Sequence, residues 1–511
     1  MNKWVKPLLS SSLAALLGIS LTLAFAPYGL FPLAIIAPAG LLLLWQGASL
    51  KYTFWLGYLF GLGWFGTGVY WVFISVHNIG GVPALFAGLI TVGFIAFLSL
   101  FPACVGLIIN RYFDNNYFNK FCYAFPATWV LGEWIRSWFL TGFPWLLIGY
   151  SQTNSPLIGF APILSVYGVS LITLVMSGFL ATLFVNYRLR NFRAVLTSLS
   201  IILVIGILGS ITNMINWTES TGERIPLSLV QGNIPQTIKW SPEHLQTSLD
   251  RYQTLTDDLW KKDQLIIWPE SAIPIPLHIA ADFVNMLDQK ARSTGSQLIL
   301  GIPIKAQQNE GYYNAIISLG KDKAVYLKKH LVPFGEYVPM GRWLGQLLNF
   351  LNIPTSDLIP GRLEQNSFSI NGYNILPSIC YEIAFPALMN TNDPNIHFLL
   401  TLTNDAWFGR SAAQAQHLQM AMMRAAEFRR PIVVVSNNGL TALIGPKGQI
   451  EALAPPYQTF VLKTEVKPTT GLTPWMRFHM DPVLIMILSF LSICVRHNMV
   501  RKRAIFNPMS G

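Results

Sequence analysis

Three side chains that can do chemistry follow apolar runs in the second half of the chain. Glu270, Lys328 and Cys380 lie 58 and 52 residues apart, and each comes at or just after a run with the pattern of a buried strand. In open α/β sheets the ends of strands are where ligands are handled, so the three groups could converge there. A carboxylate can take the proton of a thiol, and an ammonium favours the thiolate and stabilises an oxyanion. Together they are suited to acyl transfer.

Each of these residues also has a more ordinary interpretation. A glutamate after a strand is usually a solvated turn residue, and a lysine beside a second lysine usually faces water. The chain has four cysteines, too few for a disulfide framework. Cys380 is therefore either a buried, inert thiol or a nucleophile, and its neighbours must decide. The other three cysteines lie in or beside apolar runs, at Cys104, Cys122 and Cys494.

The stretch from 222 to 470 carries the three reactive groups and reads as a globular domain. Its short β-rich runs are separated by helical stretches, and many contain adjacent apolar residues, as expected of strands covered on both faces. This predicts an α/β or α+β sandwich. The predicted strands are residues 225–231, 265–268, 297–304, 313–319, 324–327, 373–379, 397–402, 432–436 and 460–465.

The remainder of the chain is nearly all apolar. Hydrophobic residues make up 52% of the 511 residues and charged residues only 12%, about half the share of charge in a soluble protein. We predict a polytopic α-helical membrane domain of about eight transmembrane helices, since most apolar runs reach the roughly 20 residues that a bilayer crossing needs. The runs lie near 8–26, 31–48, 53–75, 83–109, 121–140, 157–187, 194–212 and 481–495.

These runs give a predicted domain order. Residues 1–215 hold transmembrane helices 1–7, 222–470 the catalytic domain, 480–496 the eighth helix and 497–511 a cytoplasmic tail. The first run could be a cleavable signal peptide, but its length and the apolar span that follows favour an uncleaved helix.

The formal charge of +11 comes largely from basic residues at alternate ends of the predicted spans. The loops near 27–31, 76–82 and 141–156 have none. The positive-inside rule then places both termini in the cytoplasm and the 222–470 domain outside. The charge indicates topology rather than nucleic-acid binding. The basic residues are Lys3, Lys6, Lys51, Arg111, Lys120, Arg188, Arg190, Arg193, Arg496, Arg501, Lys502 and Arg503.

The sequence segments around the reactive residues resemble those of the carbon–nitrogen hydrolase (nitrilase) superfamily, whose members use a Glu-Lys-Cys triad on an αββα sandwich. More narrowly, the whole chain resembles the apolipoprotein N-acyltransferase family. Two departures concern loops: Ala413-Gln414 and Arg429 stand where the family pattern leads us to expect Gly-Pro and Gly. The matching segments are 230–236, Lys239-Trp240, Trp268-Pro269-Glu270, Lys328, 330–339, Cys380-Tyr381-Glu382, 403–409, Gln416-His417, 437–442, Glu133, Arg136 and 142–145.

The resemblance implies a two-step reaction. Glu270 deprotonates Cys380, the thiolate attacks a phospholipid ester, and a lysophospholipid leaves a thioester acyl-enzyme. The N-terminal amine of a diacylglyceryl-cysteine then takes the acyl chain, which is the last step of bacterial lipoprotein maturation. Lys328 stabilises the oxyanion. The resemblance implies no metal and no other cofactor.

The resemblance also implies supporting residues. Glu336 supports the geometry of Lys328 and Cys380, Tyr381 and Glu382 shape the pocket beside the nucleophile, and Trp240 lies in a mobile loop over the site. The alternative for Trp240 and Tyr381 is packing in the core or at its rim.

Partners and location follow from the same resemblance. The donor is a phospholipid, the acceptors are diacylglyceryl apolipoproteins, and the protein lies in the bacterial inner membrane with its catalytic domain on the periplasmic face. One alternative is a membrane-anchored amidase of the nitrilase type that uses the same triad. Another is a transporter with an accessory domain, but the spans lack the scattered midplane charges or paired broken helices that would support it.

Two further segments suggest roles near the membrane. The 339–351 segment has few charges and apolar residues at helical spacing, which predicts an interfacial arm or a lid helix. Glu133 and Arg136 lie three residues apart in an apolar span, which predicts an ion pair that supports the 142–145 loop.

Overall fold

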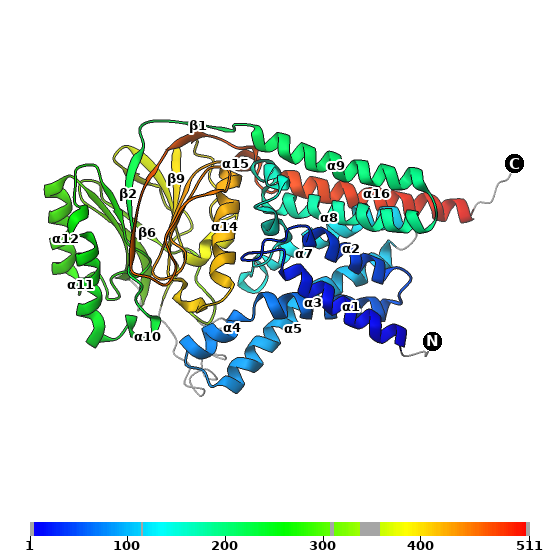
Figure 1. Ribbon diagram of the computed structural model, residues 1–511, viewed down its shortest axis with the longest axis horizontal. Helices are drawn as coiled ribbons and strands as arrows, with labels where there is room; N and C mark the ends of the chain where they lie inside the picture. The colour runs from blue at the N-terminus through cyan, green and yellow to red at the C-terminus, as the bar shows by residue number, and fades with distance from the viewer. Residues whose placement is uncertain (1–4, 114–115, 307–310, 338–357, 507–511) are drawn as a thin grey trace. The chain divides into compact units, whose positions relative to one another are not determined.

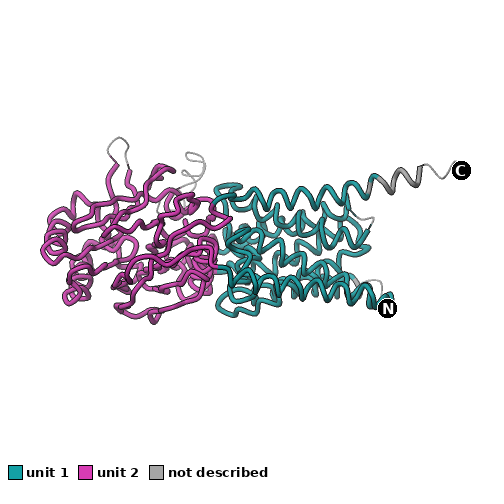
Figure 2. Tube along the Cα trace, turned by 90° about the horizontal axis from the view of Figure 1, so that it is seen from above, with its two compact units in different colours: residues 1–70, 88–215, 477–511 teal, residues 71–87, 216–476 magenta. Residues whose placement is uncertain are grey.

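The computed structural model describes residues 5–113, 116–306, 311–337 and 358–506. The chain divides into two compact units, coloured separately in Figure 2. The helical unit contains Met1–Tyr70, Gly88–Ile215 and Arg477–Gly511. The sheet unit contains Asn216–Met476 and also Trp71–Ala87, a segment that is distant in sequence from the rest of it.

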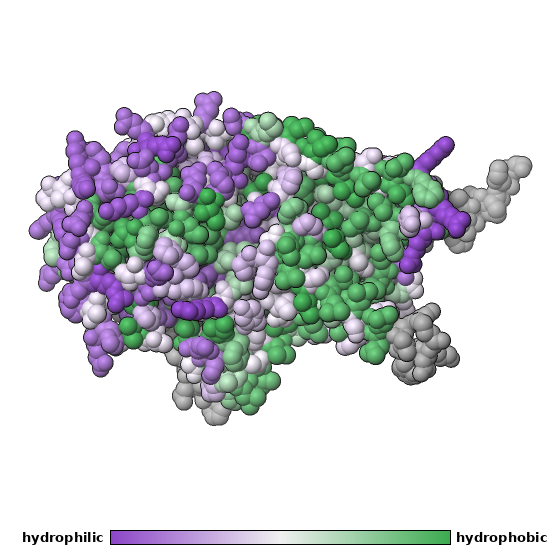
Figure 3. All heavy atoms as spheres, in the orientation of Figure 1, coloured by the Kyte–Doolittle hydropathy of each residue, from purple (hydrophilic) through white to green (hydrophobic). Residues whose placement is uncertain are grey.

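The helical unit consists of apolar helices whose outward faces are also apolar. In α9 large hydrophobic side chains are exposed along the whole length, from Phe192 to Met214. Hydrophobic side chains likewise cover most of this unit's face in Figure 3. A helix that is apolar all round needs an apolar environment. The main helices are α1 (Val5–Thr22), α2 (Leu33–Trp45), α3 (Leu50–Gly68), α5 (Ala84–Tyr112), α7 (Phe125–Arg136), α8 (Ala161–Arg188), α9 (Phe192–Met214) and α16 (Asp481–Phe506).

Three helical segments in the described part of the chain are long and apolar enough to cross a bilayer. They are Ala84–Tyr112, Pro156–Arg188 and Phe192–Met214, and the bent pair Leu50–Gly68 and Trp71–Ile79 would make a fourth. Each of the eight predicted runs contains a helix, but α2 and α7 have only 13 and 12 residues. The structure thus supports apolar spanning helices, and the count of eight stays a prediction.

Glycines allow α1 and α3 to pack at close range. A Cβ at Gly18 would lie 2.0 Å from the carbonyl oxygen of Phe60, and one at Gly63 would lie 2.2 Å from that of Ala15. Small residues at such crossings let helix backbones approach closely, as is common within membranes. Larger residues at either position would force the two helices apart.

The sheet unit contains two six-stranded sheets. In the first, ordered β13-β2-β3-β4-β5-β6, strands β2, β3 and β4 run parallel. In the second, ordered β12-β11-β10-β9-β8-β7, strands β8, β9 and β10 run parallel. The strands of the first sheet are β2 (Ile225–Gln231), β3 (Leu265–Ile267), β4 (Gln297–Lys305), β5 (Tyr312–Leu319), β6 (Ala324–Leu327) and β13 (Phe460–Val466). Those of the second are β7 (Phe368–Ile370), β8 (Tyr373–Ile379), β9 (Ile396–Thr403), β10 (Ile432–Ser436), β11 (Ala442–Ile444) and β12 (Ile450–Leu453).

All nine predicted strands are present, with each end within one residue of its prediction. The prediction missed β7, β11 and β12, and the two-stranded sheet of β1 (Thr218–Ser220) and β14 (Thr469–Gly471). These strands have three or four residues, too few to show a hydrophobic period.

Helices cover both sheets on their outer faces, which gives the four layers of an αββα sandwich. In Figure 1, α11 (Leu245–Thr256) and α12 (Ala281–Thr294) lie on one side of the strands and α14 (Ala413–Phe428) on the other. One apolar core joins the sheets, for example through Ile267 and Leu400. A second lies between the first sheet and its helices, around Tyr252 and Leu287. The expected sandwich is therefore confirmed.

The segment Trp71–Ala87 packs against a loop of the second sheet. It begins with α4 (Trp71–Phe73) and η1 (Ile74–Ile79), a π-helical turn. The Trp71 ring meets that of Phe408 edge to face at 4.9 Å, and the hydroxyl of Ser75 donates to the carbonyl oxygen of Trp407 at 2.7 Å. This contact explains why the segment belongs to the sheet unit.

Arg429 stands where a glycine was expected, and it adopts a backbone conformation that is typical of glycine. It ends α14 with φ 48° and ψ 43°, the left-handed conformation that helix ends commonly reserve for glycine. A residue with a Cβ pays roughly 1–2 kcal/mol for this conformation. The departure from the family pattern thus changes the residue and not the shape of the loop.

Candidate active site

Lys328 lies between two carboxylates in the interior of the sheet unit. It directly follows β6, and its Nζ is 2.7 Å from Oε1 of Glu336 and 3.6 Å from Oε1 of Glu270. Only 1% of the lysine side chain is exposed. Burial alone would lower the pKa of Lys328, but Glu336, Glu270 and Cys380 outweigh it and raise the pKa above its usual range. Lys328 is therefore a stable cation.

Cys380 directly follows β8 and begins the short helix η8 (Cys380–Ala384). Its φ of 50° is unusual for a residue with a side chain. Burial and the charge of Glu270 raise the pKa of its thiol well above the usual value, against the opposing effect of Lys328. The thiol is thus protonated at neutral pH. Because Glu270 and Lys328 both act on it electrostatically, the structure brings the three predicted residues to one site.

Asn314 joins the two carboxylates, and the sequence-based prediction missed it. From β5 its amide nitrogen donates to Oε1 of Glu270 at 2.7 Å and to Oε1 of Glu336 at 3.2 Å. The backbone N–H of Lys328 donates to the carbonyl oxygen of Asn314 at 2.8 Å. The available signal was an asparagine inside a largely apolar strand, since buried amides need partners.

Glu336 is held by its own loop. Its Oε2 accepts from the backbone N–H of Val332 at 2.7 Å, while its backbone N–H donates to the carbonyl oxygen of Val332 at 2.9 Å. One carboxylate oxygen is therefore committed to the loop and the other to Lys328 and Asn314. This geometry suits a residue that fixes the lysine.

Lys239 is a second buried lysine of the site, which the prediction had only as part of a motif. It ends the short helix α10 (Gln236–Lys239), and its Nζ donates to the main-chain carbonyl of Glu270 at 3.0 Å. Burial lowers its pKa to about 8, although Glu270 and Cys380 act in the opposite direction. Lys239 therefore lies within electrostatic reach of both the carboxylate and the thiol.

Glu382 connects the ends of two strands. Its carboxylate accepts from the backbone N–H groups of Ile379 at 2.7 Å, Lys329 at 2.6 Å and His330 at 3.1 Å. It also accepts from the hydroxyl of Tyr326 at 2.9 Å. Burial raises the pKa of Glu382, against these hydrogen bonds. The residue thus ties the main chain before Cys380 to the main chain after Lys328.

The two predicted aromatic residues lie in different environments. Tyr381 is buried and packs edge to face on Phe385 at 4.9 Å, with His330 at 5.9 Å. Trp240 follows α10, and 51% of it is exposed. The packing role weighed for Tyr381 is therefore present, whereas Trp240 is available to a ligand.

Within the helical unit, Glu133 and Arg136 of α7 hold the loop that follows them. Nη1 of Arg136 donates to the carbonyl oxygens of Phe143 at 2.8 Å and Trp145 at 2.7 Å. Oε1 of Glu133 accepts from the backbone N–H of Ile148 at 2.8 Å. The hydrogen bonds of Arg136 confirm the support predicted for the 142–145 loop, whereas the ion pair between Glu133 and Arg136 stays a prediction.

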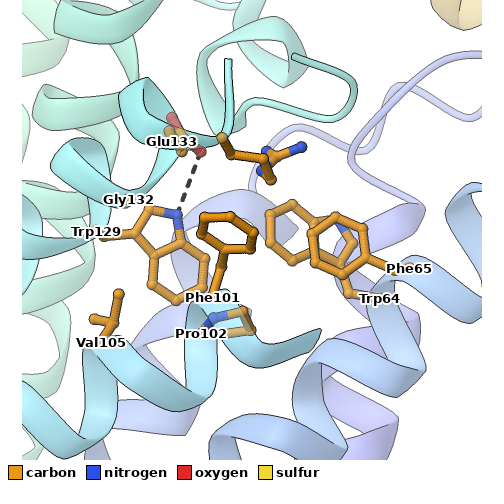
Figure 4. Close-up of a pocket in the computed structure, with 9 residues that line it drawn as sticks. Trp64, Phe65, Phe101, Pro102, Val105, Trp129, Gly132 and Glu133 are labelled. Carbon is orange, nitrogen blue, oxygen red and sulfur yellow. Dashed lines mark hydrogen bonds between the residues drawn. The ribbon is translucent and has the colours of Figure 1, made fainter. Parts of the chain in front are cut away.

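The same two side chains border a small cavity, drawn in Figure 4. Its free space suffices for about one water molecule, so it is too small for a lipid chain. The lining is mostly aromatic or apolar, and it consists of Trp64, Phe65, Phe101, Pro102, Val105, Trp129, Gly132, Glu133 and Arg136.

Two other expectations concern metal binding and the predicted interfacial arm. Within it, no group of three or more histidine, cysteine, aspartate or glutamate side chains could hold a metal ion. The predicted arm at 339–351 lies outside the described residues.

Comparison with known proteins gives matches along nearly the whole chain. The family described as "Apolipoprotein N-acyltransferase N-terminal domain" matches residues 17–179, and "Carbon-nitrogen hydrolase" matches residues 227–474. The apolipoprotein N-acyltransferase of Coxiella burnetii is 40% identical over 484 residues, covering 94% of this chain and 99% of that protein. That of Vibrio cholerae is 38% identical over 485 residues, covering 93% and 94%.

A solved carbon–nitrogen hydrolase superfamily protein of Xanthomonas campestris is also similar. It superposes with a TM-score of 0.38 and 20% identity, covering 48% of this chain and 91% of that protein. The matches to the two family descriptions and to full-length relatives lead to one assignment. The chain belongs to the apolipoprotein N-acyltransferase family.

Proposed function

We propose that the chain transfers an acyl chain from a membrane phospholipid, through a thioester on Cys380, to the N-terminal amine of a diacylglyceryl apolipoprotein. Full-length relatives that carry this activity in their name support the proposal. The observation that carries it is the buried ammonium of Lys328, held between Glu270 and Glu336 beside a protonated thiol.

In the first step Glu270 is the base. It takes the proton of Cys380, and the thiolate attacks the ester carbonyl of the phospholipid. Lys328 stabilises the oxyanion that forms. When the carbon–oxygen bond breaks, Glu270 returns the proton to the leaving oxygen, and a lysophospholipid departs. A thiol with a raised pKa needs such a base, because few thiolates exist at neutral pH.

In the second step the acceptor amine attacks the thioester. Glu270 takes a proton from the attacking nitrogen, Lys328 again stabilises the oxyanion, and the carbon–sulfur bond breaks to give an amide. The thiolate of Cys380 then regains the proton from Glu270. Thioesters react readily with amines, so two easier steps replace the direct aminolysis of an ester.

The supporting residues have distinct roles in this proposal. Glu336 and Asn314 hold Lys328 and Glu270 at their distances. Glu382 fixes the two strand ends that carry Lys328 and Cys380. Tyr381 forms a wall of the pocket beside the nucleophile, and Trp240 contacts an incoming acyl chain from its exposed position.

The proposal includes an arrangement in the bacterial inner membrane. Helices 1–7 within residues 1–215 and an eighth at 480–496 span the bilayer, the domain at 222–470 lies on the periplasmic face, and the termini and the 497–511 tail are cytoplasmic. The apolar outer face of α9 and the alternation of basic residues support it.

A membrane-anchored amidase is the less favoured alternative. It would use the same triad with water in place of the amine. The relatives align with the helical unit as well as with the sheet unit, and an anchor alone needs one span.

The deciding experiment is an intact mass of the purified protein after incubation with phospholipid alone. A hydroxylamine-labile acyl adduct is expected on the wild type and not on Cys380→Ala. Addition of a diacylglyceryl-cysteine peptide should then discharge the adduct and give a triacylated peptide. Hydrolysis of small amides without any adduct would overturn the acyltransferase in favour of the amidase.

A further inference from the structure

Asp405 and His417 form a buried pair that reaches the nucleophile. Asp405 begins the turn η9 (Asp405–Phe408) after β9, and His417 lies in α14. Nδ1 of His417 is 3.1 Å from Oδ1 of Asp405, and Nε2 of the same ring is 3.1 Å from the carbonyl oxygen of Cys380. Both side chains are only 3% exposed. The proposed mechanism so far uses neither residue.

The partners of the ring determine where its protons lie. A carbonyl oxygen only accepts, so Nε2 of His417 carries a proton and donates a hydrogen bond to the carbonyl oxygen of Cys380. Asp405 accepts from the hydroxyls of Thr403 at 2.7 Å and Ser436 at 3.2 Å, as a carboxylate does. Nδ1 of the ring faces Asp405. The two side chains therefore form a buried pair, and the Nε2 side of the ring holds the carbonyl oxygen of the nucleophile.

The hydrogen bond falls on strained backbone. Cys380 has φ 50°, a left-handed conformation that is unfavourable for a residue with a Cβ. Such strain persists only where the surroundings hold it, and it is common at active sites. A donor on the Cys380 carbonyl fixes the peptide plane that follows the nucleophile. Glu382 fixes the preceding side through the N–H of Ile379.

We propose that Asp405 and His417 are positioning residues, which hold the main chain of Cys380 in the conformation needed for acylation. This inference rests on the proposed function of Cys380. Asp405 orients the ring, the ring holds the carbonyl, and neither touches the reacting atoms. A misplacement of about 1 Å at a reacting group can lower a rate by about 10²-fold. The pair thus acts on the rate of acylation and not on the binding of phospholipid.

Two substitutions at His417 separate the bond to Cys380 from the bond to Asp405. The amide nitrogen of His417→Gln takes the place of Nε2 and can still donate to the Cys380 carbonyl. That of His417→Asn takes the place of Nδ1 and reaches only Asp405. His397→Gln is the matched control, because this histidine lies at the opposite end of β9, where its Nδ1 accepts from the backbone N–H of Asn374 at 2.9 Å.

The readout is the rate of acyl-adduct formation on Cys380 as a function of phospholipid concentration. We expect His417→Asn to lower the maximal rate by roughly 10- to 100-fold with an unchanged half-saturating concentration. His417→Gln should regain most of this loss, and His397→Gln should match the wild type. Should the Asn variant not fold, His417→Met, which has similar length and no donor, takes its place.

Two results would overturn the inference. One is a folded Asn or Met variant that is acylated at the wild-type rate. The other is an equal loss in the Gln and Asn variants, because the bond to Cys380 would then not matter. A wild type that forms no adduct would instead contradict the proposed function itself, so the two failures are distinguishable.

Discussion

The ammonium of Lys328 lies closer to Glu336 than to Glu270, at 2.7 Å against 3.6 Å. The carboxylate that holds the lysine is therefore not the one assigned as the base. In the proposed mechanism Glu336 holds the lysine, and Glu270, which makes the longer contact, accepts the proton of Cys380.

Glu336→Gln should slow acylation without unfolding the protein. The substitution removes the closer negative charge, so Lys328 shifts toward Glu270 and pairs with the base. We expect the rate of adduct formation to fall by roughly 10- to 100-fold, the effect of a misplaced catalytic group. The exposed Glu364→Gln is the control. Full activity in a well-folded Glu336→Gln would remove Glu336 from the site.

Glu270→Gln should make the thiol easier to ionise and yet abolish acylation. The charge of Glu270 raises the pKa of Cys380, so its removal lowers that pKa. The pH profile of Cys380 alkylation should shift to lower pH. Adduct formation should nevertheless fall at least roughly 10²-fold, because the general base is lost. An acylation rate that rose with the thiolate fraction would show that Glu270 is not the base.

Asn314→Ala should weaken the site through both of its carboxylates. The substitution leaves Glu270 and Glu336 without their shared donor. We expect about 1 kcal/mol less stability and roughly 10-fold slower acylation. Thermal unfolding and intact mass would measure the two effects, with the exposed Asn395→Ala as control. An unchanged acylation rate would assign Asn314 to packing alone.

Lys239→Met should change stability in a way that depends on pH. The pKa of Lys239 is about 8 in the folded protein, against about 10.4 for an unfolded lysine. Between these values the unfolded state binds more protons, so the titration of Lys239 favours folding as the pH rises. The Met variant avoids the burial of this charge. The melting temperature of the Met variant minus that of the wild type should be highest at pH 7 and decline toward pH 10. If this difference were the same at all pH values, the pKa of Lys239 would not be lowered in the folded protein.

Glu270, Lys328 and Cys380 could be predicted as a group because each stands beside a strand that an apolar run identifies, and because the residues around them resemble a known family. Their catalytic roles stay predictions. The sandwich followed from the same runs. Asn314 and Lys239 could not be assigned in this way. Their partners lie 44 and 31 residues away, and no local pattern tells which distant atom a buried amide or amine will reach.

The number of membrane spans was harder to predict than the apolar runs themselves. Composition identified every apolar run but not where helical geometry changes within one. The run at 121–140 folds as the π-helical turn η2 (Lys120–Ala124), then α7, then the 3₁₀ turn η3 (Phe139–Thr141). Hydrophobicity alone does not distinguish such a broken element from a continuous helix.

The contact of Trp71 and Ser75 with Phe408 and Trp407 has a consequence for protein engineering. A fragment that begins at residue 216 would lose the segment that contacts Trp407 and Phe408. The turn that holds these two residues would then expose apolar surface. A useful fragment must therefore retain 71–87, for example by fusing it through a linker to the start of the excised domain. The sheet unit is thus assembled from two stretches of chain that are separated in the sequence.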